Sequence, residues 1–480
     1  MNEKKIIGRE TECARLRECI ESDSAQLVIV YGRRRVGKTY LINNFFDYDF
    51  AFKITGMYNR PKEDQLEIFM KEYRRKAKLK ETVRITKWLD AFDMLRDYLE
   101  SLDTERKQVV FFDEMPWLDN QKSDFLPAFE WFWNDWASTR DNLIFIVCGS
   151  ATSWMNDKIA ANKGGLFNRQ TMKLFLKPFN LYETELFLKK KGITWSRYEI
   201  AECYMIMGGI PYYLNSLTPE LGLKQNIDRL FFDRSGELWD EFSHLYVTLF
   251  SNSPVYIKVV EVLSRRNRGM TREELSRESE LPGNGTLTKI LNDLELSGFI
   301  RITNFYRKAK KNQVYQLSDY YTAFYFRYLS SNHGLDSHFW SNSIDNPSKR
   351  AWTGFAFESL TRDHILQIKQ KLGISGVLTE ESTWFIPAEG EDSGAQIDLI
   401  IDRRDNVVNL CEMKYSINEF MIDKDYDRVL RNKISSFINA APKSKSIQLT
   451  MVTTFGVKRN MYSGLVQSEV VLDDLFAPAR

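Results

Sequence analysis

The sequence predicts a multidomain α/β protein that opens with a parallel sheet around a phosphate-binding loop. A glycine-rich loop, residues 32–39, follows an apolar run and precedes a helix-like segment. A second apolar run ends in the two acids Asp113 and Glu114. A strand, a loop and a helix in this order are typical of an α/β fold. The chain has 480 residues, so its length favours roughly three or four domains over one.

The glycine-rich loop has the pattern G-x-x-x-x-G-K-[ST] between a strand and a helix, which is the setting that this pattern requires. Its glycines let the backbone curl so that N–H groups point at phosphate oxygens. We expect Lys38 to reach the β- and γ-phosphates of ATP and Thr39 to hold Mg²⁺, while the helix N-terminus adds its positive dipole. The residues expected to bind the nucleotide are Gly32, Arg33, Arg34, Arg35, Val36, Gly37, Lys38 and Thr39, together with Asp113.

The acids at the end of the second apolar run complete a Walker B pattern. We expect Asp113 to position Mg²⁺ through water and Glu114 to polarise the water that attacks the γ-phosphate. A buried strand whose terminal acids merely cap the next element is the alternative. The phosphate loop upstream favours the catalytic interpretation, and the second acid distinguishes an ATPase from a protein that only binds nucleotide.

Two further polar residues are candidates for the same site. Ser150 follows the apolar run 143–148, where a polar side chain at the tip of a strand can touch the γ-phosphate or the attacking water. A small residue in a tight turn is an equally acceptable explanation. Arg169 follows a loop rich in Asn, Lys and Gly and is a candidate arginine finger, although an isolated arginine is more often a surface or salt-bridge residue.

The composition restricts the class of protein, but it does not identify the binding partner. Apolar residues make up 43% and charged residues 28% of the chain, and no run approaches the roughly 18 apolar residues of a membrane helix. The five cysteines are scattered without zinc spacing, and the N-terminus lacks the apolar region of a signal peptide, so we expect a cytoplasmic protein and no membrane partner. The net charge of +2 requires any nucleic-acid surface to be a local patch.

The pattern along the chain changes several times. Helical spacing of Phe125, Phe129, Phe132, Trp133 and Trp136 predicts a core face rather than a ligand cage. The Gly-Gly-Ile-Pro stretch at 208–211 predicts a fixed bend between two helices. We expect an ATPase α/β domain at 1–177, a helical lid at 178–250, a winged helix at 251–330, a linker at 331–349 and a second α/β domain at 350–480.

Two basic stretches are candidates for contact with phosphates. The run at 71–80 contains Lys71, Arg74, Arg75, Lys76, Lys78 and Lys80. A solvated helix face is its default explanation, and contact with a nucleic-acid backbone is the alternative. In the winged helix, the segment 286–294 predicts the third helix and 307–311 a basic wing. The third helix could enter a DNA major groove with the wing on phosphates, but such modules also serve as protein–protein contacts.

The C-terminal region contains a predicted hairpin with three charged residues of catalytic type. Glu412 and Lys414 are two positions apart, so they share one face of a strand. If Asp402 pairs with Val408, then Asp398 lies opposite Glu412. Two facing carboxylates can bind Mg²⁺, while the lysine activates or orients water for phosphodiester cleavage. Glu358, on a preceding helix, is the candidate fourth charged residue, and a surface hairpin with alternating charges is the alternative.

With these residues in hand, the chain resembles the archaeal-type P-loop ATPases of the STAND/AAA+ group over nearly its whole length. Its C-terminal segment looks like the restriction-endonuclease-like domain of PD-(D/E)xK type that commonly ends such ATPases, with Gln396 where similar sequences often have an acid. The resemblance implies an AAA+-like ATPase fold coupled to a winged helix and a nuclease-like module. The motifs that carry it are Gly8-Arg9-Glu10, the loop 32–39, Asp113-Glu114, Gly149-Ser150, the bend 208–211 and the winged helix.

Two functions remain open at this stage. The first is an ATP-hydrolysing switch that acts on nucleic acid, preferably DNA, with Mg²⁺ as cofactor and a C-terminal nuclease whose activity is undecided. The second is a nucleotide-controlled signalling or scaffolding ATPase with an inactive nuclease-like domain. Assembly into a homo-oligomer is compatible with both.

Overall fold

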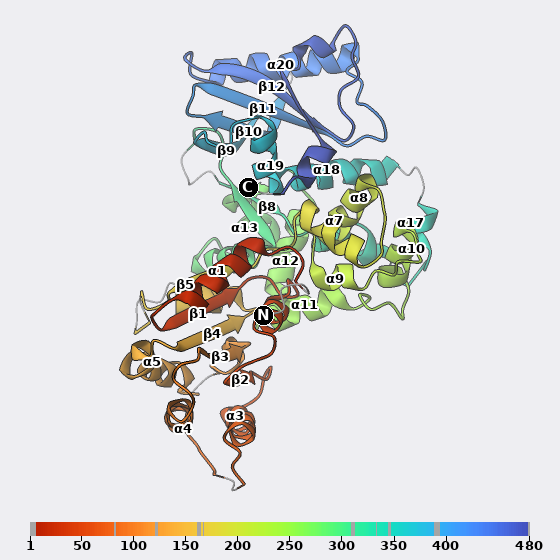
Figure 1. The fold of residues 1–480 in the computed structure, drawn as a ribbon. Coiled ribbons are helices and arrows are strands. Elements are labelled where there is room, and N and C mark those ends of the chain that lie inside the picture. The colour runs from red at the N-terminus through yellow and green to blue at the C-terminus, as the bar shows by residue number, and fades with distance from the viewer. Residues whose placement is uncertain are drawn as a thin grey trace. The chain divides into compact units, whose positions relative to one another are not determined.

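The chain folds into two compact units, Met1–Pro178 and Phe179–Arg480, which we call the N-terminal and the C-terminal unit (Figure 1). In this computed structural model the described residues are 6–80, 83–120, 123–160, 165–166, 168–308, 313–332, 334–343, 347–387 and 394–478. Within these residues, no helix is both long enough and apolar enough to cross a membrane.

The N-terminal unit is built on a five-stranded sheet in the order β2-β3-β4-β1-β5. Neighbouring strands are parallel throughout. The central strands are continuous apolar runs with fully buried side chains, as expected for a parallel sheet with both faces covered. The strands are β1 (Gln26–Tyr31), β2 (Phe52–Thr55), β3 (Gln108–Asp113), β4 (Leu143–Gly149) and β5 (Met172–Phe175).

Helices surround this sheet and supply an aromatic core. Phe125, Phe129, Phe132, Trp133 and Trp136 are all buried, which confirms the core face predicted from their spacing. The helices are α1 (Glu10–Glu21), α2 (Lys38–Phe45), α3 (Lys62–Ala77), α4 (Trp88–Glu100), α5 (Phe125–Asp135) and the short α6 (Thr152–Trp154).

The C-terminal unit begins with a helical region that contains the predicted bend. Helix α8 ends at Met207 and α9 starts at Pro211, so the bend lies where the sequence places it. Gly209 has a φ of +62°, and a Cβ there would lie 2.1 Å from the Phe179 carbonyl oxygen, so only glycine fits. The helices are α7 (Leu181–Lys190), α8 (Arg197–Met207), α9 (Pro211–Asn215), α10 (Leu223–Ile227) and α11 (Glu241–Leu249).

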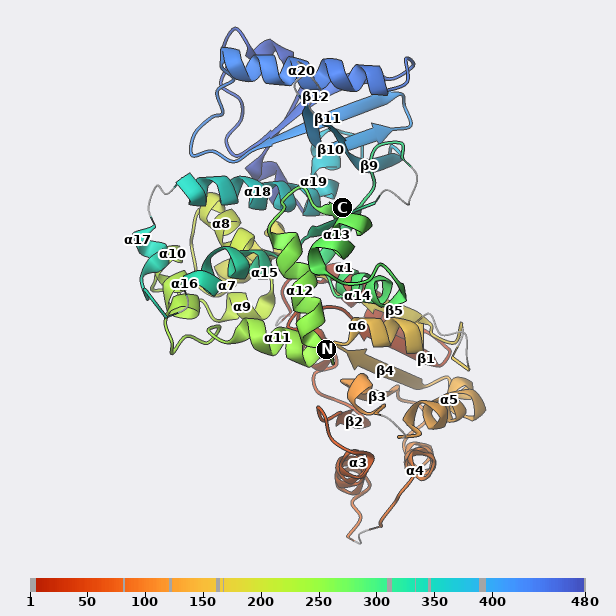
Figure 2. The same ribbon diagram turned by 180° about the vertical axis from the view of Figure 1, so that it is seen from behind.

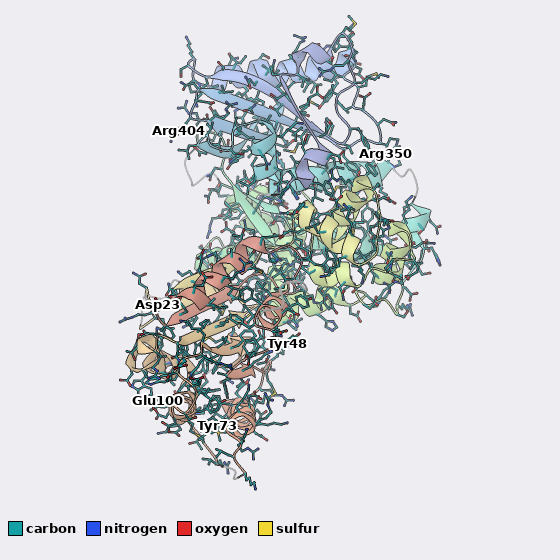
Figure 3. The ribbon with its side chains drawn as sticks, viewed as in Figure 1. Asp23, Tyr48, Tyr73, Glu100, Arg350 and Arg404 are labelled. Carbon is teal, nitrogen blue, oxygen red and sulfur yellow. The ribbon has the colours of Figure 1, made fainter. Side chains whose placement is uncertain are left out.

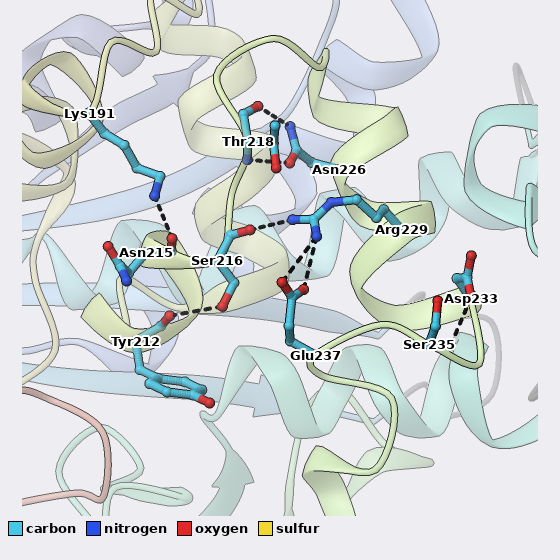
Figure 4. A network of polar contacts seen from close by, with 10 residues as sticks. All are labelled: Lys191, Tyr212, Asn215, Ser216, Thr218, Asn226, Arg229, Asp233, Ser235 and Glu237. Atoms are coloured by element: carbon cyan, nitrogen blue, oxygen red, sulfur yellow. Dashed lines mark hydrogen bonds and ion pairs between the residues drawn. The ribbon is translucent and has the colours of Figure 1, made fainter.

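A polar network fixes the chain after this bend (Figure 4). The Asn226 amide accepts from the Thr218 N–H at 2.7 Å and donates to the Thr218 carbonyl at 3.0 Å. Arg229 pairs with Glu237 at 3.0 Å and also donates to the Ser216 carbonyl. These bonds satisfy backbone groups of a segment that has few residues in regular structure.

A second part of this unit combines helices with a small sheet, in the region where the sequence predicts a winged helix. Its three-stranded antiparallel sheet has the order β6-β8-β7. Thr271 caps α13 in a reciprocal pair with Glu274, as its position before the helix predicts. The elements are α12 (Ser253–Ser264), β6 (Met270–Thr271), α13 (Arg272–Ser279), α14 (Gly285–Leu296), β7 (Ile300–Thr303), β8 (Val314–Leu317), α15 (Tyr320–Phe324), α16 (Ser330–Asn332) and α17 (Phe339–Asn342).

The last part of the chain forms a mixed sheet in the order β13-β12-β11-β10-β9 (Figures 1 and 2). Strands β9, β10 and β11 pair antiparallel, whereas β11, β12 and β13 pair parallel. Asp402 pairs with Val408, which is the predicted register. The elements are α18 (Pro347–Asp363), α19 (Ile365–Lys371), β9 (Thr379–Ile386), β10 (Ala395–Arg403), β11 (Val407–Lys414), α20 (Lys424–Ala440), β12 (Ser446–Thr453) and β13 (Ser468–Val471).

His364 joins the helical region of the C-terminal unit to its last part. Its Nε2 accepts from the Leu181 N–H at 2.9 Å, so the proton is on Nδ1, which donates to the Leu360 carbonyl at 2.8 Å. The ring is fully buried, and this burial lowers the pKa of His364 below its ordinary value. A neutral imidazole therefore satisfies the first N–H of α7 from the end of α18.

Replacing this histidine tests the junction. We expect His364→Phe to lower the free energy of unfolding by about 1–3 kcal/mol, because the buried Leu181 N–H loses its acceptor. In the wild type, the unfolded state binds a proton more readily than the folded state as the pH falls through 6.5, because the pKa of His364 is lower in the folded state. The stability that His364 contributes therefore shrinks as the pH falls. Urea unfolding at pH 8 and pH 5.5 should show the larger difference at pH 8.

The exposed His338 provides the matched control. His338→Phe should leave the unfolding midpoint close to that of the wild type at both pH values. Equal stability of His364→Phe and wild type at pH 8 would contradict the proposed junction.

Candidate active site at the phosphate loop

The phosphate loop runs from the end of β1 to the start of α2. Gly32 and Gly37 have φ values of +145° and +90°, which favour glycine. A Cβ on Gly32 would lie 2.3 Å from the Leu176 carbonyl oxygen, so no side chain fits there. The backbone of the loop is therefore set by its two glycines, as the motif predicts.

Lys38 is held inside the loop that it is expected to serve. The residue is only 5% exposed, and its Nζ donates to the carbonyls of Gly32 at 2.9 Å and Arg33 at 3.0 Å. A phosphate oxygen is a charged acceptor, and bonds to it are stronger than those to a neutral carbonyl. The Lys38 ammonium group thus lies in the loop, and its N–H donors can bind a phosphate oxygen.

Thr39 and Asp113 meet although they are far apart in sequence. The Thr39 hydroxyl donates to the two Asp113 carboxylate oxygens at 2.9 and 3.1 Å. Burial, and then the charge of Glu114, raise the pKa of Asp113, because both disfavour the charged form of its carboxyl group. A hydroxyl and a carboxylate beside another buried acid form a donor set that fits Mg²⁺.

Glu114 is held by Ser150. Ser150 donates to one Glu114 carboxylate oxygen from its backbone N–H at 3.0 Å and from its hydroxyl at 2.9 Å. Glu114 itself has a φ of +46°, a conformation that non-glycine residues rarely adopt and that costs free energy. The ends of β3 and β4 thus hold the Glu114 carboxylate in one position. The structure therefore brings together the predicted base, Glu114, and the predicted sensor, Ser150.

Strand order explains why these residues meet. Strand β4 lies between β3 and β1, and the three are parallel, so their carboxyl ends share one edge of the sheet. The phosphate loop follows β1, Glu114 follows β3, and Ser150 follows β4. Separate segments of the sequence therefore deliver an ammonium, a hydroxyl and two carboxylates to one place.

The arginines of the loop differ in their burial. Arg33 is buried, whereas Arg34 and Arg35 are half-buried. Arg9, to which the sequence assigned no role, is 5% exposed and donates to the carbonyls of Val36 at 3.3 Å and Lys177 at 2.8 Å. It braces the phosphate loop from the N-terminal side. The Gly8-Arg9-Glu10 motif was the signal that could have identified this role.

Arg169 lies at the other edge of the sheet. It is exposed shortly before β5, and the nearby Thr171 N–H donates to the Leu27 carbonyl at the start of β1. That position is the amino edge, whereas the phosphate loop is at the carboxyl edge. Arg169 therefore cannot reach the phosphate loop of its own chain, and a finger role would require a second copy.

A second cluster of charges forms at the C-terminal hairpin. Leu399 with Cys411 is the last pair of the β10–β11 ladder, and Asp398 lies next to it, where β10 has an irregularity between Ile397 and Ile400. Burial raises the pKa of Glu358 to about 8, with Asp398 and Glu412 adding to the effect and Lys414 opposing it. The four predicted residues thus interact within one cluster, and Glu358 is largely protonated at neutral pH.

Two residues of α20 that the sequence analysis missed also belong to this cluster. Lys433 Nζ lies 2.7 Å from one Glu412 carboxylate oxygen, and the Tyr426 hydroxyl donates to the other. Burial alone would raise the pKa of Glu412, but Lys433 and Lys414 outweigh it and lower that pKa. The sequence of α20 did not predict these contacts with Glu412, because Lys433 and Tyr426 are residue types that are common on the exposed face of a helix.

The carboxylates do not form a ready-made ligand set for a metal. Among the described residues, no group of three or more His, Cys, Asp or Glu side chains is arranged to hold a metal ion. The prediction that Glu358, Asp398 and Glu412 jointly ligate Mg²⁺ is therefore not supported as a three-carboxylate site. The reason is local: Glu412 is bonded to α20, and Asp398 accepts from Gln396 at 2.6 Å.

The predicted basic wing is anchored at its base. Tyr306 is 6% exposed and packs on Phe437 of α20, and its N–H donates to the Thr383 carbonyl of β9. Arg307 and Lys308 are exposed, whereas Lys310 and Lys311 lie outside the described residues. The residue just before the wing therefore contacts the last part of the chain, while Arg307 and Lys308 remain exposed.

Comparisons with known proteins identify what the first part of the chain is similar to. Residues 6–217 match a family model described as an ATPase domain predominantly from Archaea. A curated relative, an uncharacterized protein of Methanocaldococcus jannaschii, is 24% identical over 437 residues, which cover 89% of this chain and 90% of the relative. Residues 6–217 are therefore similar to this archaeal ATPase domain, and the parallel sheet is typical of a P-loop NTPase.

Several solved structures share a weaker likeness. The Walker-type ATPase of Pyrococcus abyssi is 19% identical with a TM-score of 0.47, over 68% of this chain and 97% of its own. The ORC2 protein of Aeropyrum pernix, in ADPNP–ADP complexes, is 13% identical with a TM-score of 0.42, over 68% and 93%. The RuvB Holliday junction branch migration motor of Thermotoga maritima is 15% identical with a TM-score of 0.35, over 65% and 93%.

Removing the ammonium of Lys38 tests the phosphate site. We expect Lys38→Ala to weaken ATP binding by about 1.5–3 kcal/mol, because a hydrogen bond to a charged phosphate is removed. Calorimetric titration with ATP measures the change, and the melting temperature without ATP should stay near that of the wild type. Lys173→Ala, at an exposed position on β5, is the control and should bind ATP normally. Normal affinity of Lys38→Ala would remove this residue from its assigned role.

Proposed function

We propose that this protein hydrolyses ATP with Mg²⁺ at the phosphate loop and uses the reaction as a switch on nucleic acid, with DNA favoured. One observation carries the first half of this proposal. Lys38 and Thr39, Asp113 and Glu114, and Ser150 come from three separate segments and meet at one edge of the sheet. Binding alone needs no second carboxylate, so the Glu114–Ser150 pair points to hydrolysis.

Each residue would have a distinct task. Thr39 and Asp113 would hold Mg²⁺, which supplies positive charge against the phosphates when bound. Lys38 would transfer its hydrogen bonds from loop carbonyls to phosphate oxygens. Glu114 would orient the attacking water and accept its proton, while Ser150 keeps the carboxylate in position.

The nucleic-acid half of the proposal rests on the C-terminal unit. The region from α12 to β8 has the order of helices and strands expected of a winged helix. The ATPase family match extends to residue 217 and therefore includes the bend between α8 and α9. A helical region that continues from the ATPase domain is suited to transmit the nucleotide state. Arg169, exposed and distant from its own loop, adds the expectation of a homo-oligomer.

A second candidate function is a signalling or scaffolding ATPase with an inactive nuclease-like domain. Two observations favour it. Lys433 and Tyr426 already bond both oxygens of Glu412, and the base of the wing packs on the C-terminal sheet. A carboxylate that is compensated by lysines needs no metal ion to be stable.

The base role of Glu114 can be separated from binding. We expect Glu114→Gln to retain ATP but to hydrolyse it roughly 10²–10⁴-fold more slowly, because the amide cannot accept the proton of the water. Single-turnover hydrolysis and ATP titration measure the two effects. Glu105→Gln, at an exposed position before β3, should behave like the wild type. If Glu114→Gln hydrolyses ATP at the normal rate, another group is the base.

Cleavage by the C-terminal domain decides between the two candidate functions. If the domain is active, Glu412→Ala should reduce Mg²⁺- or Mn²⁺-dependent cleavage of DNA or RNA to background while ATP hydrolysis is unchanged. Glu419→Ala, in the exposed loop after β11, is the control and should cleave normally. Absence of cleavage by the wild type on duplex and single-stranded DNA and RNA, with and without ATP, would favour the scaffolding function.

A further inference from the structure

A cavity of about 340 Å³ lies within the C-terminal unit, and neither candidate function assigns it a role. Helix α18 forms one wall of this cavity. The end of α12, the end of β8 and the segment 318–327 form the other. Small-molecule sites typically have volumes of roughly 300–1,000 Å³. The cavity is therefore large enough for one small ligand.

The cavity adjoins the C-terminal charge cluster but differs from it. Glu358 belongs to both, whereas Asp398, Glu412 and Lys414 are not among the described residues that line the cavity. Arg362 lines the cavity, and one of its guanidinium nitrogens donates to the Asp398 carbonyl. The cavity is therefore a second site that shares one carboxyl group with the cluster.

The Arg362 end of the cavity brings together segments that are distant in sequence. Arg362 is in the last turn of α18. The neighbouring Asp363 pairs with Arg301 of β7 at 3.1 Å, and Arg301 lies opposite Gln316 of β8. The Gln316 amide donates to the backbone carbonyl of Arg268 at 3.2 Å, in the loop after α12. The ends of α12, β8 and α18 therefore meet here.

Arg362 is a half-buried cation that lacks a carboxylate partner. Among the residues that the structure describes, no carboxylate lies in ion-pair distance of its guanidinium group. Burial, and then the charge of Arg301, lower the pKa of Arg362 to about 10, so the group is still charged at neutral pH. An anion in the cavity would stabilise this charge.

The arginines at the end of α12 are different, because carboxylates already neutralise them. Arg266 pairs with Glu274 at 3.2 Å and with Glu278 at 2.5 Å. Arg265 pairs with Glu261 at 2.7 Å. Both arginines line the cavity, but Arg362 is the cation at this end that is open to an anionic ligand.

Two carboxyl groups line the cavity as well. The Asp319 carboxylate is buried and accepts from the Thr322 N–H at 3.0 Å and from the Thr322 hydroxyl at 2.6 Å, so its charge is held by α15. Burial raises the pKa of Glu358 to about 8. Even a charged Glu358 would leave the four guanidinium groups of the lining in excess of the carboxylates. The lining thus favours an anion.

The middle of the cavity offers an aromatic ring and free polar groups. Phe355 of α18 is 42% exposed, and no other ring of the described residues lies against it. The side chains of Ser359 and Asn267 also line the cavity, and neither has a hydrogen-bond partner within the described parts of the chain. Phe355, Ser359 and Arg362 follow one face of α18 over about 10 Å, at 1.5 Å per residue.

The wall that carries this row is firmly packed. The Trp352 ring lies 5.7 Å from the Phe324 ring and 5.5 Å from the Tyr328 ring, between centroids. Lys349 of α18 pairs with Glu202 of α8 at 3.3 Å, and Figures 1 and 2 show these two helices beside each other. The cavity is therefore already formed without a ligand, which lowers the cost of binding one.

We propose that this cavity binds a nucleoside monophosphate, with its base against Phe355 and its phosphate at Arg362. Guanidinium groups bind phosphate through charge-assisted hydrogen bonds, and an aromatic ring can stack on any base. Ser359 and Asn267 would form hydrogen bonds with the sugar or the base. The inference goes beyond the proposed function, because this ligand is separate from the ATP at the phosphate loop and from a nucleic-acid substrate.

Calorimetric titration of the full chain with AMP, GMP, CMP and UMP in turn tests the proposal. These probes lack the β- and γ-phosphates that Lys38 is expected to contact. The test variants are Phe355→Ala and Arg362→Gln. The controls are Leu366→Ala, at an exposed position on α19, and Arg350→Gln, at an exposed position near the start of α18 (Figure 3). Neither control residue lines the cavity.

We expect the wild type to bind at least one of the four monophosphates with a dissociation constant below about 1 mM. Phe355→Ala should weaken this binding about 5–150-fold because the base loses its stacking partner. Arg362→Gln should weaken it about 10–150-fold because a bond to a charged phosphate is lost. Both controls should bind like the wild type. If Arg362→Gln has a lowered melting temperature, the exposed Phe355 decides the test.

Three outcomes would overturn the inference. The first is that none of the four monophosphates binds to the wild type at millimolar concentration. The second is that Lys38→Ala abolishes binding while Phe355→Ala retains it, which would locate the ligand at the phosphate loop. The third is that a single-stranded oligonucleotide binds in a Phe355-dependent manner while the monophosphates do not. ATP hydrolysis by Phe355→Ala should equal that of the wild type, so failure of this inference leaves the proposed function standing.

Discussion

The parallel pairing of β4 with both β1 and β3 is the constraint on which the ATPase site depends. It places three strand ends at one edge, so that Ser150 can hold Glu114 while Asp113 meets Thr39. A different strand order would leave the same residues at the same edge but not touching one another. The positive φ of Glu114 shows that the backbone accepts an unfavourable conformation to aim this carboxylate.

Buried charge distinguishes the two clusters of the molecule. At the phosphate loop, Asp113 and Glu114 are adjacent acids, and the pKa of Asp113 is raised. That arrangement gains stability from a bound cation. At the C-terminal hairpin, Lys433 and Lys414 already lower the pKa of Glu412, and the pKa of Glu358 is raised to about 8. In the second cluster two lysines already compensate Glu412, so a metal ion would compete with α20 for this carboxylate.

Local patterns in the sequence were sufficient to predict many of the helices and strands and part of the ATPase site. The phosphate loop, the acid pair, the bend at 208–211 and the hairpin register could all be predicted, because each depends on residues close in sequence or on strand periodicity. The contacts of Arg9, Lys433 and Tyr426 could not, because they join distant segments and each residue type is common on surfaces. The contact of Tyr306 with Phe437, just before the basic wing, could not be predicted either, because it joins segments that are far apart in sequence.

The central claim is that ATP turnover at the phosphate loop is coupled to nucleic acid. Its most direct test is the rate of phosphate release by the full chain with Mg²⁺, measured with and without saturating duplex DNA. The account predicts hydrolysis that stops when EDTA removes the metal and a rate that changes when DNA is added. ATP that is bound but not hydrolysed under either condition would contradict it.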